Sequence, residues 1–166
     1  STTVDIKSKP LKQILSQVMN GIKGISLVED TPSISPNLLF LYLEDLRQAY
    51  NELKKGKSKC KKKKKVTKSY ETKRKHLKIL LKYLDKDYSS TKKTLYPMLE
   101  SGIITYDFLW ALYKPNTLAF TSTYGCADEP RVFKVEIAEK ESSMLKGEWY
   151  NIEGKYLEYD GKIWGM

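Results

Sequence analysis

The chain of 166 residues is 40% hydrophobic and carries a formal net charge of +10. A chain of this length buries about 68–70% of its extended surface on folding, so its core needs no covalent support. The two cysteines give no basis for a disulfide framework or a metal site. No apolar run reaches the roughly 18–20 residues that span a bilayer. We therefore expect no membrane span and an intracellular, reducing location, in the nucleus or the cytoplasm.

The positive charge is confined to one segment. Residues 54–75 hold 13 Lys or Arg against a single acid, Glu71, which gives this segment a net charge of +12. The other 17 basic and 19 acidic residues leave the rest of the chain at −2. The pattern indicates a nearly neutral body with one basic insert. Because the chain starts at Ser1 and stops soon after a turn signal, we also expect a fragment of a longer polypeptide.

Apolar residues recur at helical spacing in the first part of the chain. Residues 8–22 and 36–53 each form an amphipathic stretch, and Gly56 is expected to break the second. A third stretch covers residues 70–88, and its inward-facing residues are Leu77, Leu80, Leu81, Leu84 and Tyr88. A fourth, shorter helix is expected around Pro97, which fits best in a first helical turn.

The later part of the chain alternates as strands do. Residues 117–123, 131–137 and 149–159 are predicted strands, and the last is followed by Asp160 and Gly161. An Asp-Gly pair suits the positive φ angles of a type I′ turn, so we expect a hairpin there.

The order of these elements predicts an α+β fold, with N-terminal amphipathic helices packed on a small C-terminal antiparallel sheet. We expect one domain over residues 1–166, with a Lys-rich loop at residues 54–75 between two helices. At the N-terminus, Val4 and Ile6 alternate as in a short edge strand.

Residues 102–116 mark the change from helical to strand periodicity. Thr105 is a suitable N-cap, and Asp107 in the first turn suits the helix dipole. Pro115 is expected to end this helix, because the residue before a proline is pushed out of the helical region. The apolar face of the predicted helix consists of Phe108, Leu109, Leu112 and Tyr113.

The residue patterns contain no complete catalytic or nucleotide site. Residues 56–58 read Gly-Lys-Ser, but a phosphate loop also needs a glycine where the chain has Asn51. The only histidine, His76, has no partner at catalytic or metal spacing, which favours a structural or surface role. Cys126 is best read as a small turn or core residue. We therefore expect no catalytic residue, cofactor or metal within these residues.

The aromatic residues allow two interpretations. Trp110, Trp149 and Trp164 lie at helix or strand spacing, where aromatic residues are most often core or cross-strand partners. The alternative is a groove near Tyr156 and Tyr159 that accepts a strand or helix of a partner.

Five consecutive lysines are the most distinctive local feature, and three interpretations stay open. The segment is a solvated loop, a nuclear import signal, or a contact for the phosphates of nucleic acid or an acidic membrane. The residues concerned are Lys61, Lys62, Lys63, Lys64 and Lys65.

The chain resembles the uncharacterised domain that precedes the AAA+ ATPase module in a large fungal ATPase family. The resemblance covers most of residues 6–53 and 76–165, and it is strongest over Gly102-Ile-Ile-Thr-Tyr-Asp-Phe-Leu-Trp-Ala-Leu-Tyr-Lys-Pro115. Where the family pattern has glycine, this chain has Asn116, which also tolerates a left-handed turn. The motif positions with an expected structural role are Thr105, Asp107, Leu109, Trp110, Pro115, Asp160 and Gly161.

This resemblance implies a non-catalytic recognition or regulatory domain within a larger AAA+ ATPase. ATP and magnesium would bind in a downstream module, and the partners would be that module in cis and a protein substrate or adaptor. The alternative from a different class is a nucleic-acid-binding module that uses the basic segment from Lys54 to Lys75.

Overall fold

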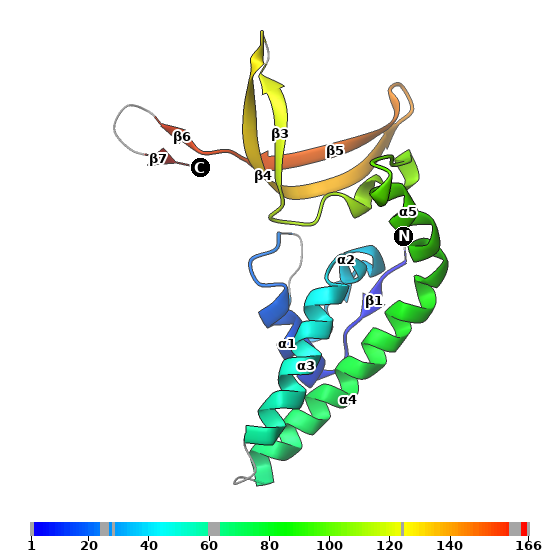
Figure 1. Cartoon of the computed structure of the whole chain (residues 1–166), viewed down its shortest axis with the longest axis vertical. Helices are drawn as coiled ribbons and strands as arrows, with labels where there is room; N and C mark the ends of the chain where they lie inside the picture. The colour runs from blue at the N-terminus through cyan, green and yellow to red at the C-terminus, as the bar shows by residue number, and fades with distance from the viewer. Residues whose placement is uncertain are drawn as a thin grey trace. The chain divides into compact units, whose positions relative to one another are not determined.

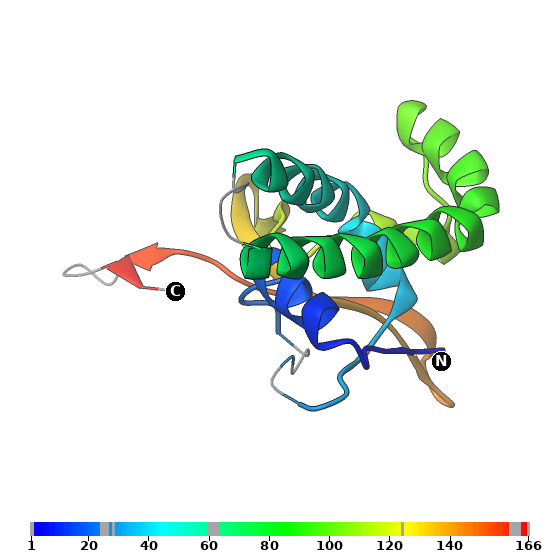
Figure 2. The ribbon, with the colours of Figure 1, turned by 90° about the horizontal axis from the view of Figure 1, so that it is seen from below.

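The computed structural model describes residues 2–23, 27, 29–59, 64–123, 125–159 and 164–165. The chain divides into two compact units, Ser1–Ile104 and Thr105–Met166, which we describe separately (Figures 1 and 2). Helices dominate the first unit and an antiparallel sheet dominates the second. The predicted α+β class is therefore confirmed.

The first unit, which we call the helical unit, is built on two long neighbouring helices. Helices α3 and α4 run side by side in opposite directions, and the shorter elements lie around them (Figures 1 and 2). Its elements are β1 (Val4–Asp5), α1 (Lys9–Val18), β2 (Ser33–Ile34), α2 (Pro36–Leu41), α3 (Leu43–Lys59), α4 (Lys64–Asp87) and α5 (Ser89–Glu100).

Helix α1 begins and packs as its sequence predicts. Ser8 is the N-cap, and its hydroxyl oxygen accepts a hydrogen bond from the Leu11 N–H at 3.2 Å. Pro10 lies in the first turn, where its missing N–H costs no helical hydrogen bond. Ile14 and Leu15 follow Leu11 on the buried face. This helix connects the first strand to the core of the helical unit.

Aliphatic side chains from every helix of this unit form the core. Phe40 of α2 stacks on Tyr88 with 4.5 Å between the ring centroids, and the Tyr88 hydroxyl donates to Asn37 Oδ1 at 2.6 Å. The side chains with 1% exposure or less include Leu15, Ile34, Leu39, Leu46, Leu77, Leu84 and Leu95. The packing therefore fixes the orientation of α4, which matters for the site described below.

The predicted loop over residues 54–75 is wrong for residues 54–59 and 64–75, which are helical. Lysine is a good helix former, and pairing of α3 with α4 supplies the packing that a lone helix lacks. Gly56 lies inside α3 rather than ending it. A Cβ atom at this position would be 3.5 Å from the Tyr70 ring of α4, which is an ordinary van der Waals distance, so Tyr70 packs beside Gly56.

Two further helix boundaries differ from the expectation. The stretch predicted as one helix over residues 36–53 is divided at Tyr42 into α2 and α3. Pro97 lies in the last part of α5, which begins at Ser89, rather than in a first turn. A proline at this position cannot donate the helical hydrogen bond to the carbonyl four residues earlier.

The second unit, which we call the sheet unit, contains a three-stranded meander. Its elements are η1 (Tyr106–Ala111), β3 (Leu118–Thr123), β4 (Cys126–Ser143), β5 (Gly147–Lys155), β6 (Glu158–Tyr159) and β7 (Trp164–Gly165). The strand order is β3-β4-β5, and all neighbours are antiparallel. The first two predicted strands are confirmed, although β4 is longer than expected. The predicted strand over residues 149–159 is divided into β5 and β6, which belong to different sheets.

A bulge and a left-handed turn shape this sheet. The register of β4 against β5 shifts between Val135 and Ile137, which interrupts the strict alternation that the sequence predicted. Asn116 has a φ of 70°, as expected for a residue that tolerates a left-handed turn. Its N–H donates to the Val135 carbonyl at 2.8 Å, and the Val135 N–H donates to Thr117 at 2.9 Å. The turn is thereby fixed to the middle of β4.

The segment after Gly102 is a 3-10 helix rather than the predicted α-helix. It covers Tyr106–Ala111, and Leu112 N–H donates to the Leu109 carbonyl at 3.0 Å, three residues back. Its backbone hydrogen bonds therefore close over three residues, as in a 3-10 turn, rather than over four. The helix also ends before Lys114, so Pro115 follows it without ending it.

The C-terminal hairpin is confirmed by the antiparallel pairing of β6 with β7. Tyr159 pairs with Trp164, so the connection is longer than a two-residue turn. Asp160 and Gly161 lie outside the described residues.

Candidate recognition groove

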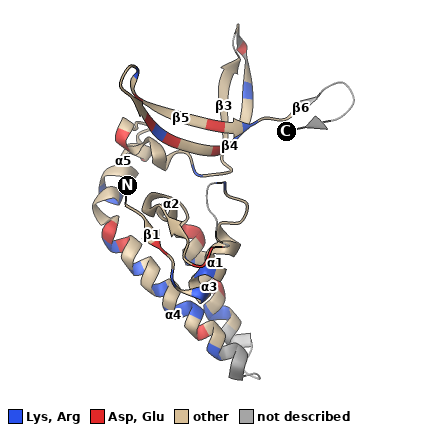
Figure 3. Cartoon of the chain, turned by 180° about the vertical axis from the view of Figure 1, so that it is seen from behind, with Lys and Arg blue, Asp and Glu red and all other residues tan. Residues whose placement is uncertain are grey.

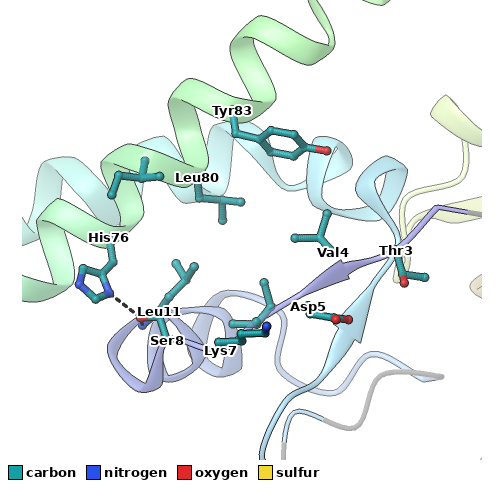
Figure 4. A pocket seen from close by; sticks show the side chains of 11 residues that line it. Thr3, Val4, Asp5, Lys7, Ser8, Leu11, His76, Leu80 and Tyr83 are labelled. Atoms are coloured by element: carbon teal, nitrogen blue, oxygen red, sulfur yellow. Dashed lines mark hydrogen bonds between the residues drawn. The ribbon is translucent and has the colours of Figure 1, made fainter.

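An apolar groove lies between β1 and α4 in the helical unit (Figure 4). Its volume is about 540 Å³, and residues 3–8 form one side. The other side consists of His76, Ile79, Leu80 and Tyr83 of α4, and Leu11 of α1 also contributes.

The wall formed by α4 contains apolar side chains that the core does not cover. Leu77, Leu80 and Leu84 are buried and hold the helix against its neighbours. Ile79 is 69% exposed and Tyr83 is 37% exposed, one helical turn apart. An i, i+4 pair lies on one face of a helix, so both side chains border the same groove. The buried leucines thus fix the position of the exposed pair, Ile79 and Tyr83.

A hydrogen bond ties the first helix to α4 at one end of the groove. Ser8 Oγ lies 2.5 Å from His76 Nδ1 (Figure 4). The same oxygen also accepts from the Leu11 N–H, so Ser8 both caps α1 and contacts His76. This contact links two residues that are 68 positions apart.

The groove has a positively charged border. Lysines recur along α4 in Figure 3, and Lys75 and Lys86 are exposed at the two ends of the groove-lining stretch. Lys7 is exposed and lines the groove from the side of β1. Two acids lie nearby, Asp5, which accepts from the Ser33 hydroxyl at 2.5 Å, and Asp87. The pKa of Tyr83 is raised by partial burial and by the carboxylate of Asp87, so its hydroxyl stays protonated at neutral pH.

A second cavity of about 550 Å³ lies on the sheet unit. It is more polar, since Arg131 and residues 121–123 (Thr-Ser-Thr) line it together with Tyr156. The Arg131 guanidinium carbon lies 5.1 Å from the centroid of the Tyr156 ring. The expected aromatic groove near Tyr156 thus has a counterpart in the structure. The side chain of Tyr159 is outside the described part of the chain.

The lysine run divides between described and undescribed residues. Lys61, Lys62 and Lys63 lie outside the described residues. The backbone of Lys64 and Lys65 lies in the first turn of α4. The helical flanks of the run carry exposed lysines at positions 54, 55, 68 and 75. The described part of the run therefore belongs to α4.

The motif residues of the 102–116 segment have structural positions. Thr105 is the N-cap of η1 in an extended conformation, but its side chain makes no capping hydrogen bond. Asp107 lies in the first turn, as predicted. Leu109 and Trp110 are half-buried within η1, and Pro115 precedes the left-handed Asn116. These residues position the entry to the sheet.

Sequence reasoning missed the groove between β1 and α4. The predicted inward stripe of the third helix contained Leu77, Leu80 and Leu84, and these are buried. The available signal was the second apolar pair, Ile79 and Tyr83, which falls outside that stripe at i, i+4 spacing. Which strand lies opposite this pair depends on tertiary contacts that periodicity does not contain.

The described residues contain no metal-ligating cluster and no helix suited to a membrane. No group of three or more His, Cys, Asp or Glu side chains there could hold a metal ion. Within the same residues, no helix is both long and apolar enough to cross a membrane.

Comparison with known proteins found a match for the C-terminal part of the chain only. The comparisons with curated proteins and with solved structures gave no match. One family model matches residues 94–166, which begin within α5 and continue through the sheet unit, so the groove residues precede the match. This model is described as a domain of unknown function, DUF7025.

Proposed function

We propose that this chain is a non-catalytic recognition domain that binds segments of partner proteins in the groove between β1 and α4. The observation that supports this proposal most is the open apolar wall formed by Ile79 and Tyr83, beside a cavity of about 540 Å³. Apolar side chains exposed next to a preformed hollow gain free energy when a partner covers them. The core residues behind this wall keep it in place without a ligand.

Selection of random dodecapeptides displayed on phage tests this proposal. The bait is the chain of 166 residues, and the Ile79→Ala, Tyr83→Ala double variant serves for counter-selection. We expect peptides that lose at least about tenfold in affinity for the variant, because two apolar contacts are removed. The matched control is Leu99→Ala, which truncates an apolar side chain of α5 that is 41% exposed and outside the groove. Failure to obtain any groove-dependent peptide would overturn the proposal.

We further propose that this recognition serves a larger AAA+ ATPase, whose ATP and magnesium bind in a downstream module. The support for this part is the sequence resemblance of residues 6–53 and 76–165. In that setting the chain recruits a substrate or adaptor, or regulates the ATPase module in cis. Purified chain should hydrolyse ATP no faster than a protein-free control. Hydrolysis above that control would show that the chain is catalytic.

Nucleic-acid binding through the basic segment is the second candidate function. It is favoured by one observation, the exposure of Lys54, Lys55, Lys68 and Lys75 on the helical flanks of the lysine run. Several cations held on helices contact phosphates at a lower entropic cost than cations on a loop. Titration of labelled DNA and RNA at about 50 and 200 mM salt separates the candidates. Binding that persists at the higher salt and disappears when residues 61–65 become Gln would place nucleic acid first.

A further inference from the structure

The short strand β1 has an edge that its own sheet does not use. Within the described residues β1 pairs with β2 alone, with Val4 opposite Ile34 and Asp5 opposite Ser33. The Ile6 N–H donates to the Pro32 carbonyl at 2.9 Å and continues this register. In an antiparallel pair the backbone groups of successive residues alternate between the two sides. The N–H and C=O of Asp5 therefore face away from β2.

This outward edge borders the apolar groove. Residues 3–8 line the cavity without a break, and neither residue of β2 lines it. Val4 extends from β1 toward the side of the groove where Leu80 and Tyr83 lie (Figure 4). A strand added at about 4.8 Å from β1 would lie beside Val4, with alternate side chains over the exposed wall of α4. The groove thus combines backbone groups for strand pairing with an apolar surface for side chains.

The charges at the groove favour an acidic occupant. Lys75 lies four positions before Ile79, and Lys86 lies three positions after Tyr83, so each is a surface neighbour of the apolar wall. Both are exposed, as is Lys7 on the opposite side. Asp5 and Asp87 only partly offset these cations. Outside residues 54–75, residues 1–104 contain 10 basic and 9 acidic residues, so the acidic preference rests on the three lysines at the groove rather than on the charge of the whole unit.

We propose that the groove binds an extended peptide by strand addition to β1, with an apolar side chain against Ile79 and Tyr83 and acidic residues on either side. This inference rests on the proposed function and names the conformation and chemistry of the partner segment. Main-chain hydrogen bonds supply affinity in this mode, and the apolar and basic surfaces select the sequence.

Backbone N-methylation tests the strand conformation. The probe is the tightest groove-dependent dodecapeptide from the selection, labelled with fluorescein and methylated at one amide at a time. Methylation of an amide that faces β1 removes one hydrogen bond and should cost about tenfold in affinity. Methylation of the next amide, which faces away, should change the affinity by less than about twofold. A loss that does not alternate along the peptide would overturn strand addition.

Charge variants test the acidic preference. Lys7→Gln, Lys75→Gln and Lys86→Gln together should weaken binding of the same peptide about three- to tenfold, with a smaller loss at high salt. The matched control is Lys54→Gln with Lys55→Gln, which removes exposed lysines of α3 outside the groove. Equal affinity for the groove variant and the wild type would overturn the acidic preference. Displacement of the peptide by an oligonucleotide at the groove would also overturn it.

The two levels of the proposal fail in different ways. If no selected peptide depends on Ile79 and Tyr83, both the proposed function and this inference are wrong. If groove-dependent peptides bind without alternation or without acidic residues, the proposed function stands and the strand-addition inference is wrong. Circular dichroism of each variant verifies that the helical unit is folded.

Discussion

The helical unit, Ser1–Ile104, and the sheet unit, Thr105–Met166, differ in both core and charge. Every buried apolar side chain of the described residues belongs to the helical unit except Val135. The helical unit has a net charge of +13, whereas the sheet unit has 7 basic and 10 acidic residues and a net charge of −3. A well-packed core can hold an exposed apolar wall in a fixed position. This is why the groove of the helical unit is the stronger candidate site.

The largest expected loss of stability follows from truncating a core side chain behind the groove. Leu77 is fully buried in α4, so Leu77→Ala should lower the free energy of unfolding of the helical unit by about 2–5 kcal/mol. Chemical denaturation followed by far-UV circular dichroism reports this, because the α-helices lie in the helical unit. Lys78→Ala, at the exposed neighbouring position, is the control and should change stability by less than about 0.5 kcal/mol. A small effect of Leu77→Ala would contradict the packed core.

Val135 is the fully buried side chain among the described residues of the sheet unit, and its truncation should cost less stability. Val135→Ala removes about two methylene equivalents and should cost about 1.5–2 kcal/mol. Tryptophan fluorescence follows this unit selectively, because Trp110, Trp149 and Trp164 all lie within it. A loss as large as that of Leu77→Ala would show that the two cores are comparable, and the contrast between the units would be wrong.

Elements with a clear period could be predicted, and their boundaries could not. The amphipathic pattern over residues 8–22 predicted α1, and alternation predicted the three main strands. Lysine-rich residues 54–75 were expected as a loop, because like charges bury nothing. The sequence pattern does not show that α3 and α4 pair, or that Tyr70 covers Gly56. The groove was missed for the same reason, since β1 and α4 are brought together by tertiary contacts.

The smallest expected effect concerns an ion-pair cluster of the helical unit. Asp85 Oδ1 accepts from Lys92 Nζ at 2.6 Å and from Arg47 Nη2 at 2.5 Å. Hydrogen bonding from Lys92, together with the charge of Arg47, holds the pKa of Asp85 below its usual value. A lowered folded-state pKa stabilises the protein above the unfolded pKa of about 4, and this contribution is lost as the pH falls through the folded value.

Asp85→Asn should therefore cost no more than about 1 kcal/mol at pH 7, since the carboxylate is 40% exposed. The difference from wild type should shrink as the pH falls from 5 to 2, as measured by denaturation at each pH. Glu100→Gln, at an exposed carboxylate at the end of α5, is the matched control. A difference that grows toward acidic pH would contradict the sign of this pKa shift.

The most direct test of the account is to map the bound peptide on the isotope-labelled chain by NMR. The peptide selected on the wild-type chain is added stepwise, and backbone amide shifts are followed at 50 and 200 mM salt. We expect backbone shift changes clustered at residues 3–8 and 76–83, with the largest near Asp5. Changes confined to residues 105–166, or to lysines 54 and 55 on α3, would contradict recognition in the groove.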